Sequence, residues 1–166
     1  LFIKYFAAGR LTQGVPFVLY SIGKRKGFIK TIHTYGHVIA SSLTVGFGGS
    51  VGLEGPSIVT GSALGSGISQ IFHLNPKRKI LLLGCGAAAA ISALFNSPIA
   101  AVIFVLEIIL VELKVAFMIP LLFASATSFI VSWIVSGQTP IFDKVVLSKL
   151  EISHIPFYLI LGAFTG

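Results

Sequence analysis

Charged side chains are scarce in this sequence, and acidic ones are the scarcest. Of 166 residues, 10% are charged, and only five are aspartate or glutamate. A soluble domain carries about 25% charged residues on average. This shortage, together with 55% hydrophobic residues and a mean hydropathy of +0.97, excludes an ordinary soluble domain and is typical of a membrane protein.

Cysteine is nearly absent too. Cys85 is the only one, so no disulfide can form within the chain. Its neighbours are glycine and alanine, which favours a small packing residue over a reactive thiol. The front of the chain shows no signal peptide and opens on Leu1 rather than methionine. Because the other end, Gly166, falls inside an apolar segment, we expect residues 1–166 to be an internal piece of a longer membrane protein.

Basic residues give a formal net charge of +7, which by itself would suit a nucleic-acid-binding protein. Seven of the twelve lysine and arginine residues, however, are gathered in two short clusters between apolar runs, at residues 24–30 and 77–79. Short basic loops beside membrane segments usually lie on the cytoplasmic side. We therefore expect both clusters there, in a multi-pass protein of the plasma (inner) membrane, and we expect no nucleic-acid partner.

Long uncharged runs supply the membrane segments. The clearest are residues 31–53, 80–106 and 115–142. A spanning helix needs roughly 20 apolar residues, so each run has room for one span or a pair of short ones. Within the chain, Gly61 and Gly65 form a small-xxx-small pair, which lets helices pack closely. The sequence predicts an all-α membrane protein with broken and tilted transmembrane helices.

The segment between the two basic clusters is too rich in glycine at its middle for two full spans. It holds 46 residues, of which two spans would need roughly 40, but residues 46–67 include eight glycines. We expect an unequal hairpin: a helix over residues 31–45, a backbone break over 46–55, and a second helix from Pro56 to about Phe72. Irregular backbone at membrane depth is tolerated where it is buried in protein or lines a water-filled cavity. The break therefore indicates a pathway or a binding site.

Three prolines, Pro16, Pro56 and Pro98, follow a glycine or polar break, and each is expected to begin a helix. Proline is favoured in the first helical turn, where its missing N–H costs nothing. Many transporters build ion sites from discontinuous helices whose N-termini lie inside the membrane. The alternative is that each proline only kinks a helix, but three such breaks favour the site.

If two of these helix starts, residues 15–16 and 55–56, converge, they form an anion site without any lysine. A helix N-terminus carries roughly +0.5 of an elementary charge and presents free N–H donors. No lysine or arginine lies between Lys30 and Lys77 to hold the ion more tightly, and conduction needs binding weak enough for the ion to leave. The sequence therefore predicts a transported anion and no cofactor.

Glu54 is the first acidic residue of the chain and lies directly before the predicted helix start. A carboxylate at membrane depth costs about 2.5–3.5 kcal/mol and marks a functional position. Its charge is favoured beside N-terminal N–H groups, where it would compete with a permeant anion. Protonated or displaced, it would leave the site open. We interpret Glu54 as a gate sensitive to pH and to the anion; the alternative is a plain capping acid.

Three motifs resemble those of the chloride channel and chloride/proton antiporter family. Residues 52–56, GLEGP, resemble the family's G-[KR]-E-G-P motif, whose glutamate is the family's gate. Residues 95–107, FNSPIA running on to FVLE, resemble the segment downstream of that gate. Residues 12–16, TQGVP, fall where the family has G-S-G-I-P. The three motifs occur in order at compatible spacing and cover most of residues 10–110.

The resemblance implies a homodimer with one anion pathway per subunit, each subunit built from two inverted repeats. This chain would be a partial transmembrane chloride-channel domain over residues 1–166, with most of the first repeat and the start of the second. The family's later G-x-F-x-P motif and pore tyrosine would follow Gly166, and residues 98–107 and 115–135 would lie near the dimer interface. The anion-binding residues implied by the motifs are Gln13, Gly14, Val15, Pro16, Leu53, Glu54, Gly55 and Pro56.

Three positions depart from the family pattern. Leu53 replaces the base beside the gate, which removes a positive charge from the approach of the anion. Gln13 replaces the serine that binds the anion through its hydroxyl, and it offers an N–H donor on a larger side chain. Ile108 stands where the antiporters have a second, proton-relaying glutamate, and Glu107 is about 100° away around a helix. Because isoleucine cannot carry a proton, Ile108 favours passive conduction of chloride or a similar anion over a proton-coupled antiporter.

The remaining polar residues support other functions only weakly. His33 and His37 share a helix face, which is half of a metal site; we expect no metal there and predict solvated histidines near the cytoplasmic end of their helix. An intramembrane hydrolase would need Ser50 or Ser57 beside these histidines, but both serines lie at or beyond the far end of that helix. No nucleophile-elbow motif is present either, so no enzyme activity is predicted. A non-conducting structural subunit is the remaining alternative.

Overall fold

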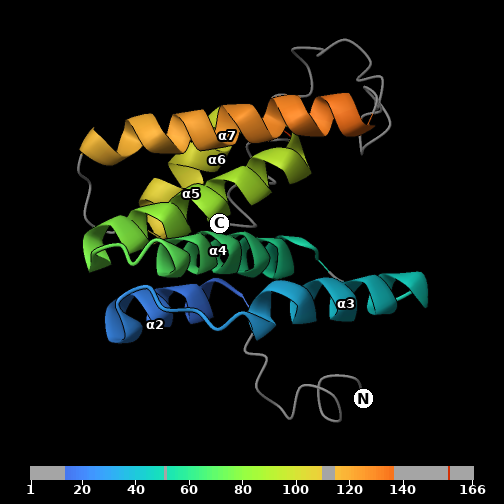
Figure 1. The fold of residues 1–166 in the computed structure, drawn as a ribbon. Coiled ribbons are helices and arrows are strands. Elements are labelled where there is room, and N and C mark those ends of the chain that lie inside the picture. Colours follow the sequence, from blue (N-terminus) through green and yellow to red (C-terminus); the bar gives the residue numbers. More distant parts are fainter. Residues whose placement is uncertain (1–13, 51, 110–114, 137–156, 158–166) are drawn as a thin grey trace.

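The structure is a computed structural model that describes residues 14–50, 52–109, 115–136 and 157. Regular structure in these ranges is entirely helical, which confirms the predicted all-α class. α4 lies in the middle, with α2 and α3 on one side and α5, α6 and α7 on the other (Figure 1). In chain order the helices are α2 (Val15–Arg25), α3 (Ile32–Gly46), α4 (Glu54–Ile71), α5 (Pro76–Phe95), α6 (Pro98–Phe104), the π-helix η1 (Val105–Ile109) and α7 (Val115–Ser136).

α3 and α4 form the predicted hairpin, but its limits differ slightly from those expected. The break is shorter, residues 47–53, because α4 begins at Glu54, two residues ahead of Pro56. Proline is tolerated there since the N–H groups of a first turn have no carbonyl partner within the helix. The N–H of Ser57 donates the first regular bond, to the carbonyl of Leu53 at 3.0 Å. Glu54 is therefore the first helical residue and not the residue before the helix.

α4 and α5 make the most extensive contact between any two of the described helices, and glycine sets their separation. A Cβ on Gly65 would overlap the backbone carbonyl oxygen of Leu82, and one on Gly61 would overlap that of Gly86. A Cβ on Gly86 would in turn overlap the carbonyl of Gly61. The predicted small-xxx-small pair is therefore confirmed as the place where two helix backbones approach with no side chain between them.

Serine hydroxyls connect α5 to α7. Ser128 and Ser132 of α7 both donate to carbonyls of α5, and the shorter bond runs from Ser128 to Ala89 at 2.7 Å. Ser92 of α5 donates in the opposite direction, to the carbonyl of Ser125 at 2.7 Å. Hydrogen bonds between membrane helices contribute roughly 0.6 kcal/mol on average. These bonds therefore stabilise one relative position of α5 and α7.

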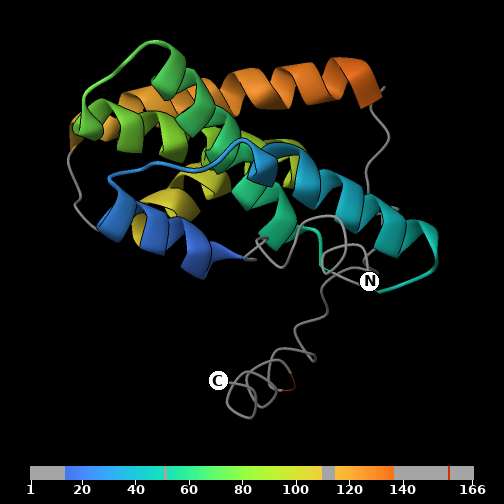
Figure 2. The same cartoon turned by 60° about the horizontal axis from the view of Figure 1, so that its bottom comes forward.

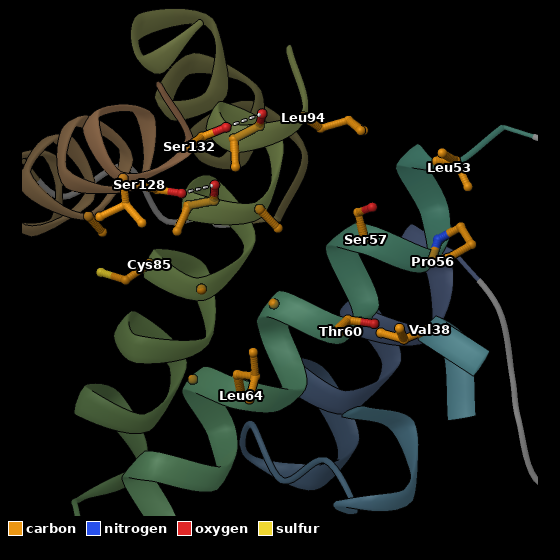
Figure 3. Close-up of a pocket in the computed structure, with 18 of the residues that line it drawn as sticks. Val38, Leu53, Pro56, Ser57, Thr60, Leu64, Cys85, Leu94, Ser128 and Ser132 are labelled. Carbon is orange, nitrogen blue, oxygen red and sulfur yellow. Dashed lines mark hydrogen bonds between the residues drawn. The ribbon is translucent and has the colours of Figure 1, made fainter. Parts of the chain in front are cut away.

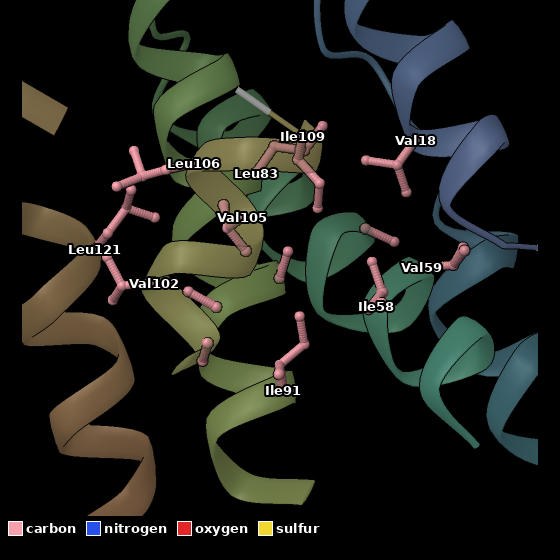
Figure 4. Packing of buried hydrophobic residues seen from close by; sticks show 14 of the residues in the cluster. Val18, Ile58, Val59, Leu83, Ile91, Val102, Val105, Leu106, Ile109 and Leu121 are labelled. Carbon is pink, nitrogen blue, oxygen red and sulfur yellow. The ribbon is translucent and has the colours of Figure 1, made fainter. Parts of the chain in front are cut away.

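The buried core lies between α2, α4, α5 and the segment formed by α6 and η1 (Figure 4). Val18, Val59 and Leu83 are fully buried there. The outer side of α7 is instead exposed and apolar, with Phe123 at 69% and Ile134 at 68% exposure. α5 and the Phe117–Ser136 part of α7 are long and apolar enough to cross a membrane. An apolar face turned outward is what a spanning helix presents to lipid.

The two basic clusters lie at the same end of the helices. Gly27, in the turn after α2, has a positive φ of 79°. A Cβ there would come 3.3 Å from side-chain atoms of Lys79 and Ile80, which begin α5. The turn after α2 therefore packs against the first turns of α5. This arrangement agrees with the expectation that both clusters face the same side of a membrane.

Candidate functional site

Each of the three prolines stands in the first turn of a helix. Pro16 is the second residue of α2, Pro56 the third of α4 and Pro98 the first of α6. Gly14 precedes α2 with φ 83°, a value that favours glycine, and Asn96 closes α5 in the left-handed region with φ 52°. The helix starts predicted at the prolines are confirmed, and none of the three is only a kink.

The starts of α2 and α4 lie against each other. A Cβ on Gly55 would come 3.6 Å from the Cα of Gly14, so a methyl group would just fit between the two backbones. From there α2, drawn in blue, and α4, drawn in teal to green, run side by side in roughly the same direction (Figures 1 and 2). The N–H groups of Val15, Glu54 and Gly55, which precede the first backbone bonds of the two helices, are brought to one place. We call Gly14, Val15, Glu54 and Gly55 the helix-start junction.

Glu54 stands at this junction as the first residue of α4. Its carboxylate turns back over the break and lies against Gly52, where an added Cβ would overlap Oε2. A carboxylate in the first helical turn is favoured by about 0.3–1 kcal/mol through the partial positive charge of the N-terminus. Because the side chain is exposed, it can leave this position without disturbing the buried core.

The remaining residues predicted for the anion site fall on the same two helix starts, with one exception. Val15 is the first residue of α2 and is half-buried beside Gly14. Leu53 is the residue before α4 and is 39% exposed. Gln13 lies outside the described residues, so the position of its side chain stays a prediction.

A groove of about 960 Å³ runs from the start of α4 along α5 to α7 (Figure 3). Leu53 and Pro56 line one end of it, and Ser128 of α7 lies toward the other. Its walls are mostly apolar, although the hydroxyl of Thr60 is buried and has no hydrogen-bond partner in the described ranges. Glu54 does not line the groove. The groove therefore lies beside the helix-start junction and does not include it.

Ile108 and Glu107 both lie in η1, where the sequence predicted a regular helix. This π-helix widens a single turn directly after α6. Both side chains are exposed in the described part of the chain, Ile108 to 38%. η1 also contacts α2, the helix whose start forms half of the junction. Single π turns are frequent at functional sites, so Ile108 falls in a segment of uncommon geometry.

His33 and His37 are buried, so the prediction of solvated histidines is wrong. Their exposed fractions are 3% and 2%. The ring of His33 stacks on Phe17 of α2 with ring centroids 4.4 Å apart, and its Nδ1 lies 3.5 Å from Nε2 of His37. The sequence alone gave no sign that α2 would cover the start of α3. In the ranges that the structure describes, no group of three or more histidine, cysteine or acidic residues could hold a metal ion.

Sequence reasoning also missed the polar contacts that attach the turn after α2 to α4. Ser66 and Gln70, one helical turn apart on α4, bind backbone groups of Gly27 and Ile29. The signal was a set of serines at positions 62, 66 and 69, which recur on one face of a helix. Polar groups on a buried face need hydrogen-bond partners. That the partner is the backbone of a turn could not be read from the spacing.

Comparison with known proteins agrees with the motifs. The sequence profile of the family described as voltage gated chloride channel matches residues 1–166. The chain is 31% identical over 147 residues to Chloride channel protein CLC-e of Arabidopsis thaliana, which covers 84% of this chain and 20% of that protein. It is 33% identical over 130 residues to the H(+)/Cl(-) exchange transporter ClcA of Salmonella arizonae, which covers 74% of this chain and 27% of that protein.

The chain thus spans 20% to 27% of the length of these curated relatives. No solved structure matches it. One relative is named a channel and the other an exchange transporter, and both are similar to the same segment. The match over the whole sequence and the identity to these relatives show that the chain belongs to the voltage gated chloride channel family.

Proposed function

We propose that the protein carries chloride or a similar anion across a membrane, and that the helix-start junction is part of its anion pathway. One observation carries the proposal: the close approach of Gly14 and Gly55 brings the first-turn N–H groups of two helices together. Family membership supports the same function, since relatives of this segment are named for chloride conduction or chloride exchange.

Two helix N-termini supply the positive potential for the anion. Each carries roughly +0.5 of an elementary charge, so together they present about one charge without a lysine or arginine. Such a site attracts a monovalent anion and still lets it leave, as conduction requires. The anion-binding residues that we assign are Gln13, Gly14, Val15, Pro16, Leu53, Glu54, Gly55 and Pro56.

Glu54 is the gate in this proposal. Its carboxylate competes with the permeant anion for the same N–H groups, because both are negative and both gain from the helix start. Arrival of an anion displaces the carboxylate, and a proton on the carboxyl weakens its hold. Its exposure and its contact with the backbone of Gly52 support this role, since the side chain is not fixed in the core.

Conduction is passive in the form that we favour. Ile108 stands at the position of the second glutamate of the antiporters, and isoleucine carries no proton. Leu53 leaves the approach of the anion without a positive charge, and Gln13 offers an amide donor in place of a hydroxyl. The competing form is a proton-coupled exchanger, which the name of the Salmonella relative favours. We place the protein in the plasma (inner) membrane as a homodimer that needs no cofactor.

Halide flux from liposomes tests the proposal. Purified full-length protein should release trapped chloride, and Glu54→Gln should raise the rate about tenfold, equivalent to removing about 1.4 kcal/mol of competition. Glu107→Gln is the matched control, because Glu107 is also an exposed glutamate but lies in η1 and not at a helix start. Wild-type vesicles without efflux, and a Glu54→Gln variant that changes nothing, would show that the proposed function is wrong.

A pH-sensitive dye in the same vesicles separates the two forms of transport. A chloride gradient should drive no proton movement through the wild-type protein, because the position of the proton-relaying glutamate is Ile108. Uphill proton movement would instead establish the exchanger and refute passive conduction, while the assignment of the anion site would stand.

A further inference from the structure

Two polar side chains of α4 hold the turn that follows α2. The hydroxyl of Ser66 accepts the N–H of Ile29 at 3.0 Å and donates to the carbonyl of Gly27 at 2.7 Å. The amide of Gln70 donates to the carbonyl of Ile29 and to the hydroxyl of Ser66, each at 3.1 Å. Ser66 is fully buried and Ile29 is 1% exposed. We call Ser66 and Gln70 the α4 clamp.

α2 thus lies against α4 at both of its ends and is hydrogen-bonded to it at one. At one end Gly14 meets Gly55, and at the other the clamp holds the turn at Gly27. About three helical turns of α4 separate Gly55 from Ser66, a length of roughly 16 Å. Between its two ends, Val18 of α2 and Val59 of α4 belong to the same buried apolar core. The clamp therefore fixes how far along α4 the start of α2 can lie.

The clamp opposes two electrostatic repulsions. The first acts at the helix-start junction, where two N-termini with the same partial charge lie side by side, and no hydrogen bond joins Gly14 to Gly55 there. The second acts at the other end, where the basic residues 24–26 and 77–79 are brought together by the contact of Gly27 with Lys79. Like charges repel, and the hydrogen bonds of the clamp, together with the apolar packing of Phe17 and Val18, act against that repulsion.

We propose that Ser66 and Gln70 are the positioning residues of the anion site: by holding the turn after α2, they keep the start of α2 at the distance from α4 at which both helix starts contact one small anion. This inference rests on the proposed function. Without the clamp the two starts separate, so chloride binds less tightly and larger anions are better tolerated.

Full-length protein carrying Ser66→Ala tests the role of the clamp. Chloride binding is measured by calorimetry in detergent, and the ratio of chloride to thiocyanate efflux is measured in liposomes. Ser66→Ala should weaken chloride binding about fivefold and lower the chloride-to-thiocyanate ratio. A merely structural residue would lower the folded fraction and leave the ratio of the folded protein unchanged.

Ser62→Ala is the matched control. Ser62 lies one turn earlier on the same face of α4 and is equally buried, but its hydroxyl has no hydrogen-bond partner in the described ranges. Its replacement should leave chloride affinity and the anion ratio unchanged. Should Ser66→Ala fail to fold, Gln70→Ala serves instead, because Gln70 is only partly buried and contributes the two longer bonds. It should shift both readouts in the same direction by a smaller factor.

The outcomes separate the two proposals. If the wild-type protein conducts chloride while the clamp variants keep its affinity and anion ratio, the clamp has no positioning role and the proposed function stands. If Ser62→Ala shifts the readouts as much as Ser66→Ala, the effect belongs to α4 in general and the inference is overturned. If the wild-type protein neither binds nor releases chloride, the proposed function is wrong and the inference falls with it.

Discussion

Glycine has opposite roles at the helix-start junction and at the contact between α4 and α5. At the α4–α5 contact, carbonyl oxygens of the facing helix occupy the space that a Cβ on Gly61 or Gly65 would take. At the junction, a Cβ on Gly55 would be 3.6 Å from Gly14, so the space between the backbones is small but empty of protein. Gly61 and Gly65 therefore let two helix backbones come into direct contact, whereas Gly14 and Gly55 leave a small space between two helix starts. The two cases differ in the distance to the neighbouring backbone, although the residue type is the same.

The largest expected effect is a loss of stability on adding a methyl group at the contact between α4 and α5. Gly65→Ala should destabilise the protein by about 3 kcal/mol or more, because the new methyl group overlaps the backbone of Leu82, which cannot move aside. Thermal unfolding of purified protein in detergent measures it. Gly67→Ala is the control, since nothing lies within 4 Å of a Cβ there and alanine is the better helix former. A Gly65→Ala variant as stable as Gly67→Ala would contradict the close packing of α4 on α5.

Adding a methyl group at the helix-start junction should leave stability unchanged and reduce chloride conduction. In Gly55→Ala the methyl group meets Gly14 at an ordinary contact distance, so the unfolding temperature should stay within a degree or two of wild type. Chloride efflux should fall about tenfold, equivalent to about 1.4 kcal/mol, because the methyl group occupies the space where the anion contacts both helix starts. Unchanged efflux from a folded Gly55→Ala protein would mean that the gap at the junction is not part of the pathway.

Removing a serine hydrogen bond between α5 and α7 should have a smaller effect on stability. Ser128→Ala removes a bond from α7 to α5 and should lower stability by about 0.6–1.7 kcal/mol. Thr127→Ala is the control, since Thr127 is exposed and its hydroxyl bonds carbonyls of its own helix. The comparison is made by unfolding both variants in the same detergent. Equal stability of the two variants would show that the serine bonds between helices do not stabilise the α5–α7 contact.

The smallest expected effect concerns charge at the junction. Leu53→Arg introduces a positive charge beside Glu54 and should raise the initial rate of chloride efflux about threefold at low ionic strength, with the gain shrinking as salt screens it. Leu53→Gln, which is polar but uncharged, should not raise the rate. An equal gain in both variants would trace the effect to side-chain polarity and not to the field of the charge.

Much of the helical framework could be predicted from sequence because the helix ends are clearly marked. Glycine and proline, together with the basic clusters, fixed the hairpin and all three helix starts to within two residues. The limit of α4 was misplaced because a proline tolerates any position in the first turn, so Pro56 does not mark which residue comes first. The π turn at η1 carries no proline or glycine signal, and nothing in the sequence announced it.

The candidate site was less predictable than the framework. Glu54 stands out by sequence because it is the first acid of the chain, and its position at a helix start follows from the proline two residues later. The meeting of Gly14 with Gly55 is a tertiary contact across 41 residues; the sequence located both helix starts, but it did not establish that they meet. The burial of His33 and His37, and the attachment of the turn after α2 to Ser66, depend on how α2 folds back. Hydrophobic periodicity does not report such contacts.

Bromide in crystals of the full-length protein tests the central claim most directly. Bromide scatters anomalously and stands in for chloride, and Glu54→Gln removes the competing carboxylate. The account predicts an anomalous peak within hydrogen-bond distance of backbone N–H groups at the starts of both α2 and α4. A conducting protein with no peak at this junction, or with bromide held only by the basic clusters, would contradict the account.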